Sequence, residues 1–251
     1  MVKTRVIPLL LLKDGLLKKP IKFINPRTVA NPISIVRVFE ARQVDELILL
    51  DIGSSAMHNN VNPDIVRMIT EELTLPFACG GGINTMEQVG ELIAAGAEKV
   101  VLNTAAVETP ELIKNVAARY GRQSVVVSID ALKTETGYKV FVRNGSKPTN
   151  LNPVNWAQEV EKIGAGEILI NSIDHDGTME GFDCQLIRSV ADAVDIPIIA
   201  AGGAGKPKDF PPAILQGHAS AVAAGSIYHY TKTTPDMVKH ALHSEGIPVR
   251  L

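Results

Sequence analysis

The segment VDELILLDI, residues 44–52, has an uninterrupted apolar run, LILL, between acidic residues, which is typical of a strand buried on both faces of a parallel sheet. AGEILINSI at 165–173 resembles it 121 residues later. LPFACGGG at 75–82 is matched at the same spacing by IPIIAAGG at 196–203. Similarity at a fixed spacing is the signature of a structure built from related units. The sequence therefore predicts two related halves.

Short apolar runs alternate with amphipathic segments along the chain. The runs predict eight strands, at residues 5–11, 45–52, 76–80, 99–103, 124–130, 166–172, 196–201 and 220–225. Helix starts are marked by a capping residue followed by proline, at Asn31–Pro32, Asn62–Pro63, Thr109–Pro110, Asn152–Pro153 and Thr234–Pro235. Eight βα units of this length favour an α/β fold of one domain over residues 1–251, a closed (β/α)8 TIM barrel made of two half-barrels. A doubly wound open sheet is the alternative, although no Gly-x-Gly-x-x-Gly turn follows the first strand.

Composition excludes several classes of protein. Hydrophobic residues make up 45% and charged residues 21% of the chain, which is typical of a folded domain rather than a disordered one. The formal net charge of −2 gives no electrostatic signal for nucleic acid or an anionic membrane. No signal-peptide cleavage site follows the first apolar run, and the two cysteines, Cys79 and Cys184, form no disulfide framework. We expect a cytoplasmic protein that binds neither nucleic acid nor membrane.

Glycine-rich turns follow strands in both halves. The third and seventh strands end in CGGGIN (79–84) and GGAG (202–205), and the fourth and eighth end in NTA (103–105) and AGS (224–226). Glycines let backbone N–H groups approach a phosphate, and a following helix start adds a favourable dipole. The alternative is that these glycines only make tight turns. Because the turns are matched in both halves, they predict a substrate with phosphate at both ends, or an ancestor that bound one phosphate.

Carboxylates stand where the strands end, at Asp51, Asp130, Asp174 and Asp176. Asp130 follows an apolar run, and burial there would raise its pKa toward the range useful for acid–base catalysis. The alternative is a structural carboxylate that caps backbone amides. The run Asp174-His175-Asp176 contains possible metal ligands, but alternation at a strand end separates them. We expect that run to bind substrate hydroxyls or phosphate, with no metal.

Four charged residues begin predicted strands and would ring the opposite, N-terminal face of the barrel: Arg5, Glu46, Lys99 and Glu167. Charges in that position require partners, so a salt-bridged plug is the simpler interpretation. The alternative is a gate on a passage through the barrel. Residues 15–30, with Lys18, Lys19 and Lys22, are predicted to form a long loop without secondary structure. Such a loop could be a lid whose lysines clasp an anionic substrate, or a plain solvated segment.

Together these segments resemble the HisF family, the cyclase subunit of imidazole glycerol phosphate synthase, over essentially the whole chain. KVVLNTAAVETPELI (99–113), VVVSIDA (125–131) and GAGEILINSIDHDGT (164–178) carry much of the resemblance. It implies that a HisH-type glutaminase docks on the N-terminal face and that ammonia passes the charged ring to reach a phosphorylated substrate, without a cofactor. The implied gate is Arg5, Glu46, Lys99 and Glu167. The implied substrate and phosphate contacts are Lys19, Gly82, Asn103, Thr104, Asp176, Gly177, Gly203, Gly225 and Ser226.

One departure from the family pattern concerns the acid–base pair. The family uses two opposed aspartates, and Asp130 matches one of them. Leu11 stands where the other is expected, and in the internal repeat Leu11 is the position that corresponds to Asp130. Leucine can neither accept nor donate a proton. Along the implied ammonia route, Ala78, Val101 and Ala201 stand where the family usually has hydroxyl side chains.

This combination is similar to that of HisF-like paralogues in bacterial surface polysaccharide synthesis. There, a glutaminase, the barrel and an ATP-using sugar amidotransferase convert an acetamido group on a sugar, typically nucleotide-linked, into an acetamidino group. The resemblance therefore predicts an ammonia-receiving subunit for acetamidino-sugar formation, with a sugar amidotransferase as a further partner. One alternative is a genuine imidazole glycerol phosphate synthase cyclase in which Asp14, Asp130 or Asp176 covers for Leu11. The other is a non-catalytic scaffold that binds a phosphosugar.

Overall fold

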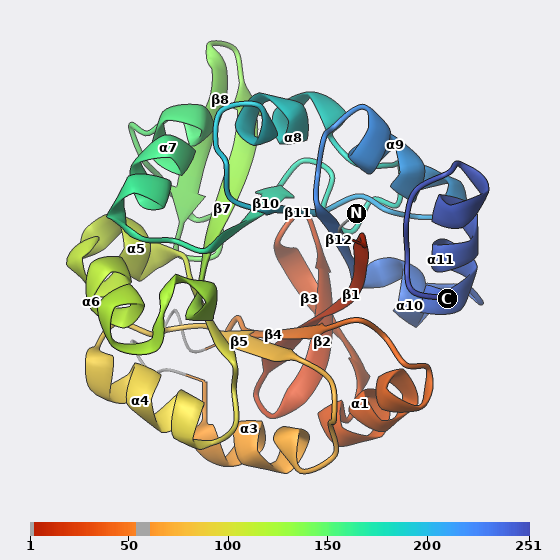
Figure 1. Ribbon diagram of the computed structural model, residues 1–251, viewed down its shortest axis with the longest axis horizontal. Helices are drawn as coiled ribbons and strands as arrows, with labels where there is room; N and C mark the ends of the chain where they lie inside the picture. The colour runs from red at the N-terminus through yellow and green to blue at the C-terminus, as the bar shows by residue number, and fades with distance from the viewer. Residues whose placement is uncertain (1–2, 54–60) are drawn as a thin grey trace.

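The computed structural model of the chain describes residues 3–53 and 61–251 and shows a closed barrel of parallel strands ringed by helices (Figure 1). In these residues eight strands form the barrel, and the pairing of the last with the first closes it. The barrel strands are β1 (Arg5–Lys13), β4 (Leu47–Asp51), β5 (Phe77–Gly80), β6 (Lys99–Leu102), β7 (Val125–Thr134), β10 (Glu167–Ser172), β11 (Ile198–Ala201) and β12 (Ala221–Ala224). The predicted (β/α)8 barrel is confirmed, and the open-sheet alternative is wrong.

Helices cover the outside of the barrel (Figure 1). They are α1 (Pro32–Ala41), α3 (Pro63–Thr70), α4 (Met86–Ala94), α5 (Thr104–Glu108), α6 (Glu111–Tyr120), α7 (Pro153–Ile163), α8 (Cys184–Ala191), α9 (Phe210–Leu215), α10 (Ser226–Tyr230) and α11 (Pro235–Ser244). Short 3-10 turns occupy Arg122–Ser124 and Pro207–Asp209. No helix in the described ranges has the length and hydropathy needed to cross a membrane.

Most of the predicted helix caps form. Asn31, Asn62, Asn152 and Thr234 each accept a hydrogen bond from the first turn of the helix that follows. The start predicted at Thr109–Pro110 differs, because α6 begins at Glu111 without a side-chain cap. There the backbone carbonyl of Thr109 accepts the N–H of Leu112 instead.

Residues 15–30 contain a β-hairpin, so the prediction of a loop without secondary structure is wrong. β2 (Leu16–Ile21) pairs antiparallel with the end of β1, and β3 (Ile24–Ala30) pairs with β2. The turn between β1 and β2 is Asp14–Gly15, with positive φ at both residues. Asp-Gly is a strong sequence signal for a two-residue hairpin, since both positions tolerate positive φ. That signal was available in the sequence.

The second half of the barrel repeats this arrangement. β7 also continues past the barrel and pairs antiparallel with β8 (Gly137–Val142), which pairs with the short β9 (Lys147–Pro148). Leu11 pairs with Lys18 of the first hairpin, and Asp130 pairs with Phe141 of the second. Both residues therefore lie where a barrel strand continues into a hairpin. The tertiary structure places Leu11 and Asp130 at equivalent positions, as the internal repeat predicted.

The hydrophobic core has two parts. The larger lies between the strands and the helices, with fully buried side chains such as Leu10, Leu49 and Phe210. The smaller fills the barrel interior and consists of Ile7, Leu9, Ile48, Ala78, Val101, Val126, Leu169, Ile199, Ala201, Ala221 and Ala223. Because the interior is packed with apolar side chains, polar chemistry is confined to the two ends of the barrel.

Candidate functional site

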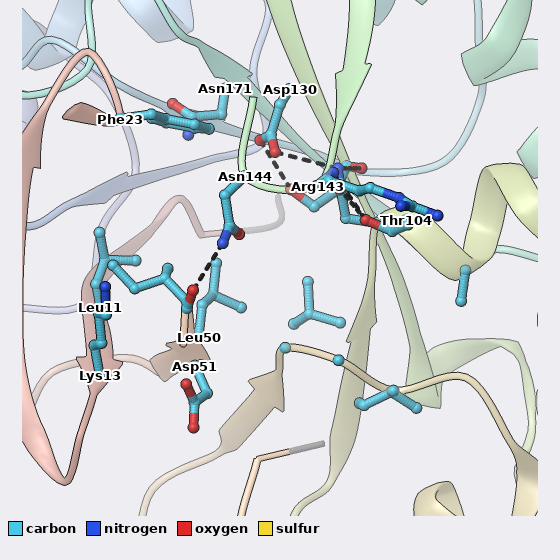
Figure 2. Close-up of a pocket in the computed structure, with 18 of the residues that line it drawn as sticks. Leu11, Lys13, Phe23, Leu50, Asp51, Thr104, Asp130, Arg143, Asn144 and Asn171 are labelled. Atoms are coloured by element: carbon cyan, nitrogen blue, oxygen red, sulfur yellow. Dashed lines mark hydrogen bonds between the residues drawn. The ribbon is translucent and has the colours of Figure 1, made fainter. Parts of the chain in front are cut away.

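A cavity of about 280 Å³ opens at the C-terminal ends of the strands (Figure 2). One part of its wall is polar and comes mainly from the second half-barrel: Asn103, Ser128, Asp130 and Asn171. Another part is apolar and comes mainly from the first half-barrel: Leu9, Leu11, Leu50 and Val101. A substrate in this cavity therefore contacts hydrogen-bonding groups on one side and hydrocarbon on the other.

Asp130 is the buried acid of the polar wall. Its carboxylate accepts a hydrogen bond of 3.2 Å from Nδ2 of Asn103 and a longer one of 3.4 Å from the hydroxyl of Ser128. Burial raises the pKa of Asp130 to about 7, and the nearby charge of Asp176 adds to the increase, while hydrogen bonds from Ser128 and Asn171 oppose it. At neutral pH this group can both take and give a proton, as acid–base catalysis requires.

Leu11 lies on a different side of the cavity from Asp130 (Figure 2). It is 8% exposed and pairs with Leu50 on β4, whereas Asp130 pairs with Asn171 on β10. Asp14, the nearest acid along the chain, is exposed, and it is not part of the cavity wall. The structure thus places an alkyl side chain, not a second acid, at the position equivalent to Asp130.

The first predicted phosphate site, formed by the turns after β5 and β6, borders this cavity. Gly82, Asn103 and Thr104 all line it. Gly81 and Gly82 have positive φ, and a Cβ on Gly81 would lie 2.2 Å from the backbone oxygen of Asp51. Only glycine fits there. Thr104 opens α5, and its hydroxyl accepts the backbone N–H of Arg143 at 3.0 Å.

The second predicted phosphate site, formed by the turns after β10, β11 and β12, borders an adjacent, much smaller cavity of about 10 Å³. Its lining includes Gly177, Gly203, Gly225 and Ser226. The hydroxyl of Ser226 is buried and has no hydrogen-bond partner among the described residues. A space of this size holds about one water molecule, so a phosphate enters only if a neighbouring group moves.

One ion pair, Lys19 with Asp176, lines both cavities. Nζ of Lys19 lies 2.8 and 3.0 Å from the two carboxylate oxygens of Asp176, and both residues line both cavities. Lys19 was expected to contact substrate, which stays a prediction, and to lie in a loop, which is wrong. Instead it is buried at 5% exposure, on a strand and already paired, because β2 holds it against the turn after β10. The ammonium group has three donors and makes two contacts to Asp176, so its third donor is the one left for an anion.

The acidic run after β10 does not converge on one point. Asp174 accepts the backbone N–H of Lys133, Nδ1 of His175 lies 2.8 Å from the carbonyl oxygen of Gly181, and Asp176 pairs with Lys19. These three side chains contact three different elements, so they are separated as expected, but by the turn after β10 rather than by strand alternation. Within the described residues, the run therefore forms parts of the mouth rather than a ligand set.

At the N-terminal face the four predicted ring residues do meet. Arg5 bonds to Glu46 and, at 2.9 Å, to Glu167. Nζ of Lys99 lies 2.9 Å from Glu46 and 3.1 Å from Glu167. Positive and negative charges thus alternate around a closed ring in which each side chain contacts two of opposite sign. Each charge is neutralised within the ring, so the barrel entrance carries no net charge from these residues.

Between the charged ring and the mouth, the interior is apolar. Ala78, Val101 and Ala201 belong to the cluster that fills it, together with small side chains such as Ala221 and Ala223. Neutral ammonia has little to lose in an apolar passage, whereas a charged ammonium ion would pay a large desolvation penalty. An apolar interior therefore opposes a charged ion much more strongly than a neutral molecule.

Several residues of the mouth were not singled out from the sequence. Asn171, Phe23, Arg143 and Asn144 line the cavity, and Nδ2 of Asn144 donates to the carbonyl oxygen of Ile52 on the first half-barrel at 2.7 Å (Figure 2). Arg143, Asn144 and Gly145 all have positive φ. Asn-Gly is a strong turn signal, so the sequence does mark this turn. What it does not show is that the turn reaches across the mouth.

Comparison with known proteins bears directly on this barrel. Residues 5–234 match the family described as "Histidine biosynthesis protein". The chain belongs to that family. It is also 45% identical over 251 residues to "Imidazole glycerol phosphate synthase subunit HisF" of Thermococcus onnurineus (strain NA1), covering 100% of this chain and 99% of that protein. The resemblance to HisF is thereby confirmed.

Two further HisF relatives match this chain over nearly the whole length of both proteins. The subunit of that name from Pyrococcus furiosus is 45% identical over 251 residues, covering 100% of both chains. The one from Streptomyces avermitilis is 43% identical over 247 residues, covering 98% of both. This member of the histidine biosynthesis protein family is therefore HisF-like over its whole described barrel.

Proposed function

We propose that this chain is the ammonia-accepting subunit of a glutamine-dependent, HisF-type synthase. A glutaminase docks on the N-terminal face, ammonia passes the ring of Arg5, Glu46, Lys99 and Glu167, and an anionic substrate binds at the opposite mouth. Three features support this: the fully paired ring, the apolar interior and the two sets of glycine turns. A partner of the HisH type is the glutaminase expected from the relatives named above.

The reaction we assign to the mouth is amidination of an acetamido sugar rather than imidazole ring formation. The observation that carries this assignment is Leu11, an alkyl side chain at the position equivalent to Asp130. Ring formation by two opposed acids would lose one of its two proton carriers here. Loss of such a group typically lowers the rate by about 10²- to 10⁴-fold.

Amidination makes a smaller demand on the barrel. Replacing the carbonyl oxygen of an acetamide by nitrogen requires that the oxygen first become a good leaving group, which an ATP-using amidotransferase partner supplies. The barrel then delivers ammonia, and Asp130 can accept the proton that the attacking nitrogen loses. One carboxylate with a pKa of about 7 is sufficient for that step.

A second candidate is genuine imidazole glycerol phosphate synthase activity. The relatives favour it, because all of those described above bear that name at 43–45% identity. In that case the missing proton carrier is replaced by another acid of the mouth. Asp176 lines the cavity but is paired with Lys19, and Asp51 lines it from the end of β4.

One experiment separates the two candidates. The chain is purified with a HisH-type glutaminase, and glutamine-dependent turnover is measured on the bisphosphorylated histidine-pathway substrate. In parallel it is measured on a nucleotide-linked acetamido sugar with ATP and a sugar amidotransferase. We expect product only in the second assay. Turnover of the first substrate at the rate of a two-aspartate cyclase would establish the second candidate, and glutamine-dependent product in neither assay would contradict the proposal.

A further inference from the structure

We propose that Arg143 binds the substrate phosphate held by two neighbouring turns, the one after β5 with Gly82 and the one after β6 with Asn103 and Thr104. This inference rests on the proposed function for its anionic substrate, but it concerns a residue that the family pattern does not assign. Arg143 directly follows β8, on the hairpin after β7. It lines the mouth cavity together with Gly82, Asn103 and Thr104.

Arg143 makes hydrogen bonds to both ends of α5. Its backbone N–H donates to the hydroxyl of Thr104, the first residue of α5, at 3.0 Å (Figure 2). Its Nε and Nη2 donate to one carboxylate oxygen of Glu108, the last residue of α5, at 3.2 and 3.0 Å. The guanidinium is thereby held alongside the helix whose start was predicted to bind phosphate.

The first hairpin also carries a cation close to its pairing with the barrel strand, although one residue out of register with Arg143. Lys19 follows Lys18, the hairpin residue paired with Leu11, and Arg143 lies two residues after Phe141, the hairpin residue paired with Asp130. Each hairpin thus carries a cation shortly after the equivalent pairing.

The two cations also have equivalent neighbours. The side chain of Lys19 lies beside Gly225, where an added Cβ would be 3.7 Å from its Cδ and Cε, immediately before Ser226 opens α10. The backbone N–H of Arg143 contacts Thr104, which opens α5, and its guanidinium contacts Glu108 at the other end of that helix. Each cation is paired with an acid, Lys19 with Asp176 and Arg143 with Glu108. Each predicted phosphate site therefore shares its cavity with one cationic residue of a hairpin.

The two sites differ in how readily the cation can move. The Lys19 side chain is 5% exposed, whereas that of Arg143 is 43% exposed. Exposed ion pairs contribute little to stability, so exchange of Glu108 for a phosphate costs Arg143 little. A guanidinium also matches two phosphate oxygens at once. The hydroxyl of Thr104 accepts from Arg143 and keeps its own proton, held now by a weak 3.4 Å contact to Asn103, for a phosphate oxygen.

The test is a titration of the intact chain with inorganic phosphate, followed by the NMR shifts of the backbone amides of Gly82 and Thr104. We expect Arg143→Gln to weaken phosphate binding at these amides about tenfold or more, since it removes charge-assisted hydrogen bonds. Arg143→Lys keeps the charge and should recover part of the affinity. The matched control is Lys147→Gln, because Lys147 pairs with the same Glu108 at 3.4 Å but does not line the cavity. It should change the affinity less than about twofold.

Equal affinity in the wild type and in Arg143→Gln overturns the inference, as does equal weakening by Lys147→Gln or a wild-type chain whose Gly82 and Thr104 amides do not respond. None of these results bears on delivery of ammonia, which the glutamine-dependent assays measure separately. Conversely, loss of phosphate binding in Arg143→Gln together with no product in either assay would support the inference and contradict the proposed function alone.

Discussion

The two half-barrels agree in their turns and differ in the side chains between them. Gly81–Gly82 and Gly202–Gly203 both have positive φ, and Asn103–Thr104 and Gly225–Ser226 both open five-residue helices. The first half then presents Leu9, Leu11 and Leu50 to the mouth, where the second half presents Ser128, Asp130 and Asn171.

This difference separates binding from chemistry. Backbone amides at glycine turns recognise an anion through the shape of the chain, so either half can keep that ability while its side chains change. Proton transfer depends on particular side chains and is lost with a single substitution. In the proposed function both halves hold an anion, but only one presents an acid at the equivalent strand end.

The largest expected effect comes from removing the acid of the second half. Asp130→Asn keeps the shape of the side chain and its contact with Asn103 but cannot carry the proton. We expect glutamine-dependent turnover of the complex to fall about 10²- to 10⁴-fold, with little change in glutaminase activity. Steady-state kinetics with the wild type as reference measures it. Unchanged turnover would show that Asp130 is structural and would favour a scaffold role for the barrel.

The converse change makes the first half resemble the second. Leu11→Asp places a carboxylate at the position equivalent to Asp130, and we expect imidazole ring formation to rise about 10²-fold or more above the wild type. The control is Leu50→Asp, which adds a carboxylate to the same wall on the neighbouring strand. If Leu11→Asp gained no more activity than Leu50→Asp, the comparison of the half-barrels would not explain the missing activity.

The charged ring tests a feature on which both halves agree. Glu46→Gln leaves two cations of the ring, Arg5 and Lys99, to share the single acid Glu167, and Glu46 is 1% exposed. We expect the free energy of unfolding to fall by about 3 kcal/mol, as when one partner of a buried ion pair is removed. Glu167→Gln, at 13% exposure, should cost less. Urea denaturation measures both, with Glu72→Gln in the exposed Arg37 pair as the control that should change little.

A further prediction concerns the slope of stability with pH. Burial raises the pKa of Asp130 from 3.8 to about 7, so the folded chain binds a proton more tightly than the unfolded chain. The contribution of Asp130 to stability is therefore fully present below about pH 3.8 and is lost as the pH rises through about 7. The difference in urea midpoint between the wild type and Asp130→Asn, followed from pH 4 to 8, isolates this group. A difference that does not change with pH would contradict the raised pKa.

Much of the fold was predictable because it is encoded locally. Buried strands of a parallel sheet are short apolar runs, and helix starts after Asn31, Asn62 and Asn152 carry their own caps. The hairpin at residues 16–30 was missed because its alternation is interrupted at register shifts, although the Asp-Gly turn announces it. Lys19 was predicted near the substrate, but its partner Asp176 is 157 residues away, and no local pattern reports such a pairing.

The sequence by itself determined the barrel, its two related halves and the unequal pair of Leu11 and Asp130, because these follow from period, spacing and residue type. Only the tertiary structure decided which charges are free and which are paired. Ring closure at the N-terminal face, the Lys19–Asp176 pair between the cavities and the place of Arg143 beside Thr104 depend on contacts between distant elements. The pKa of Asp130 belongs to the same group, because burial is a property of the assembled barrel rather than of the strand.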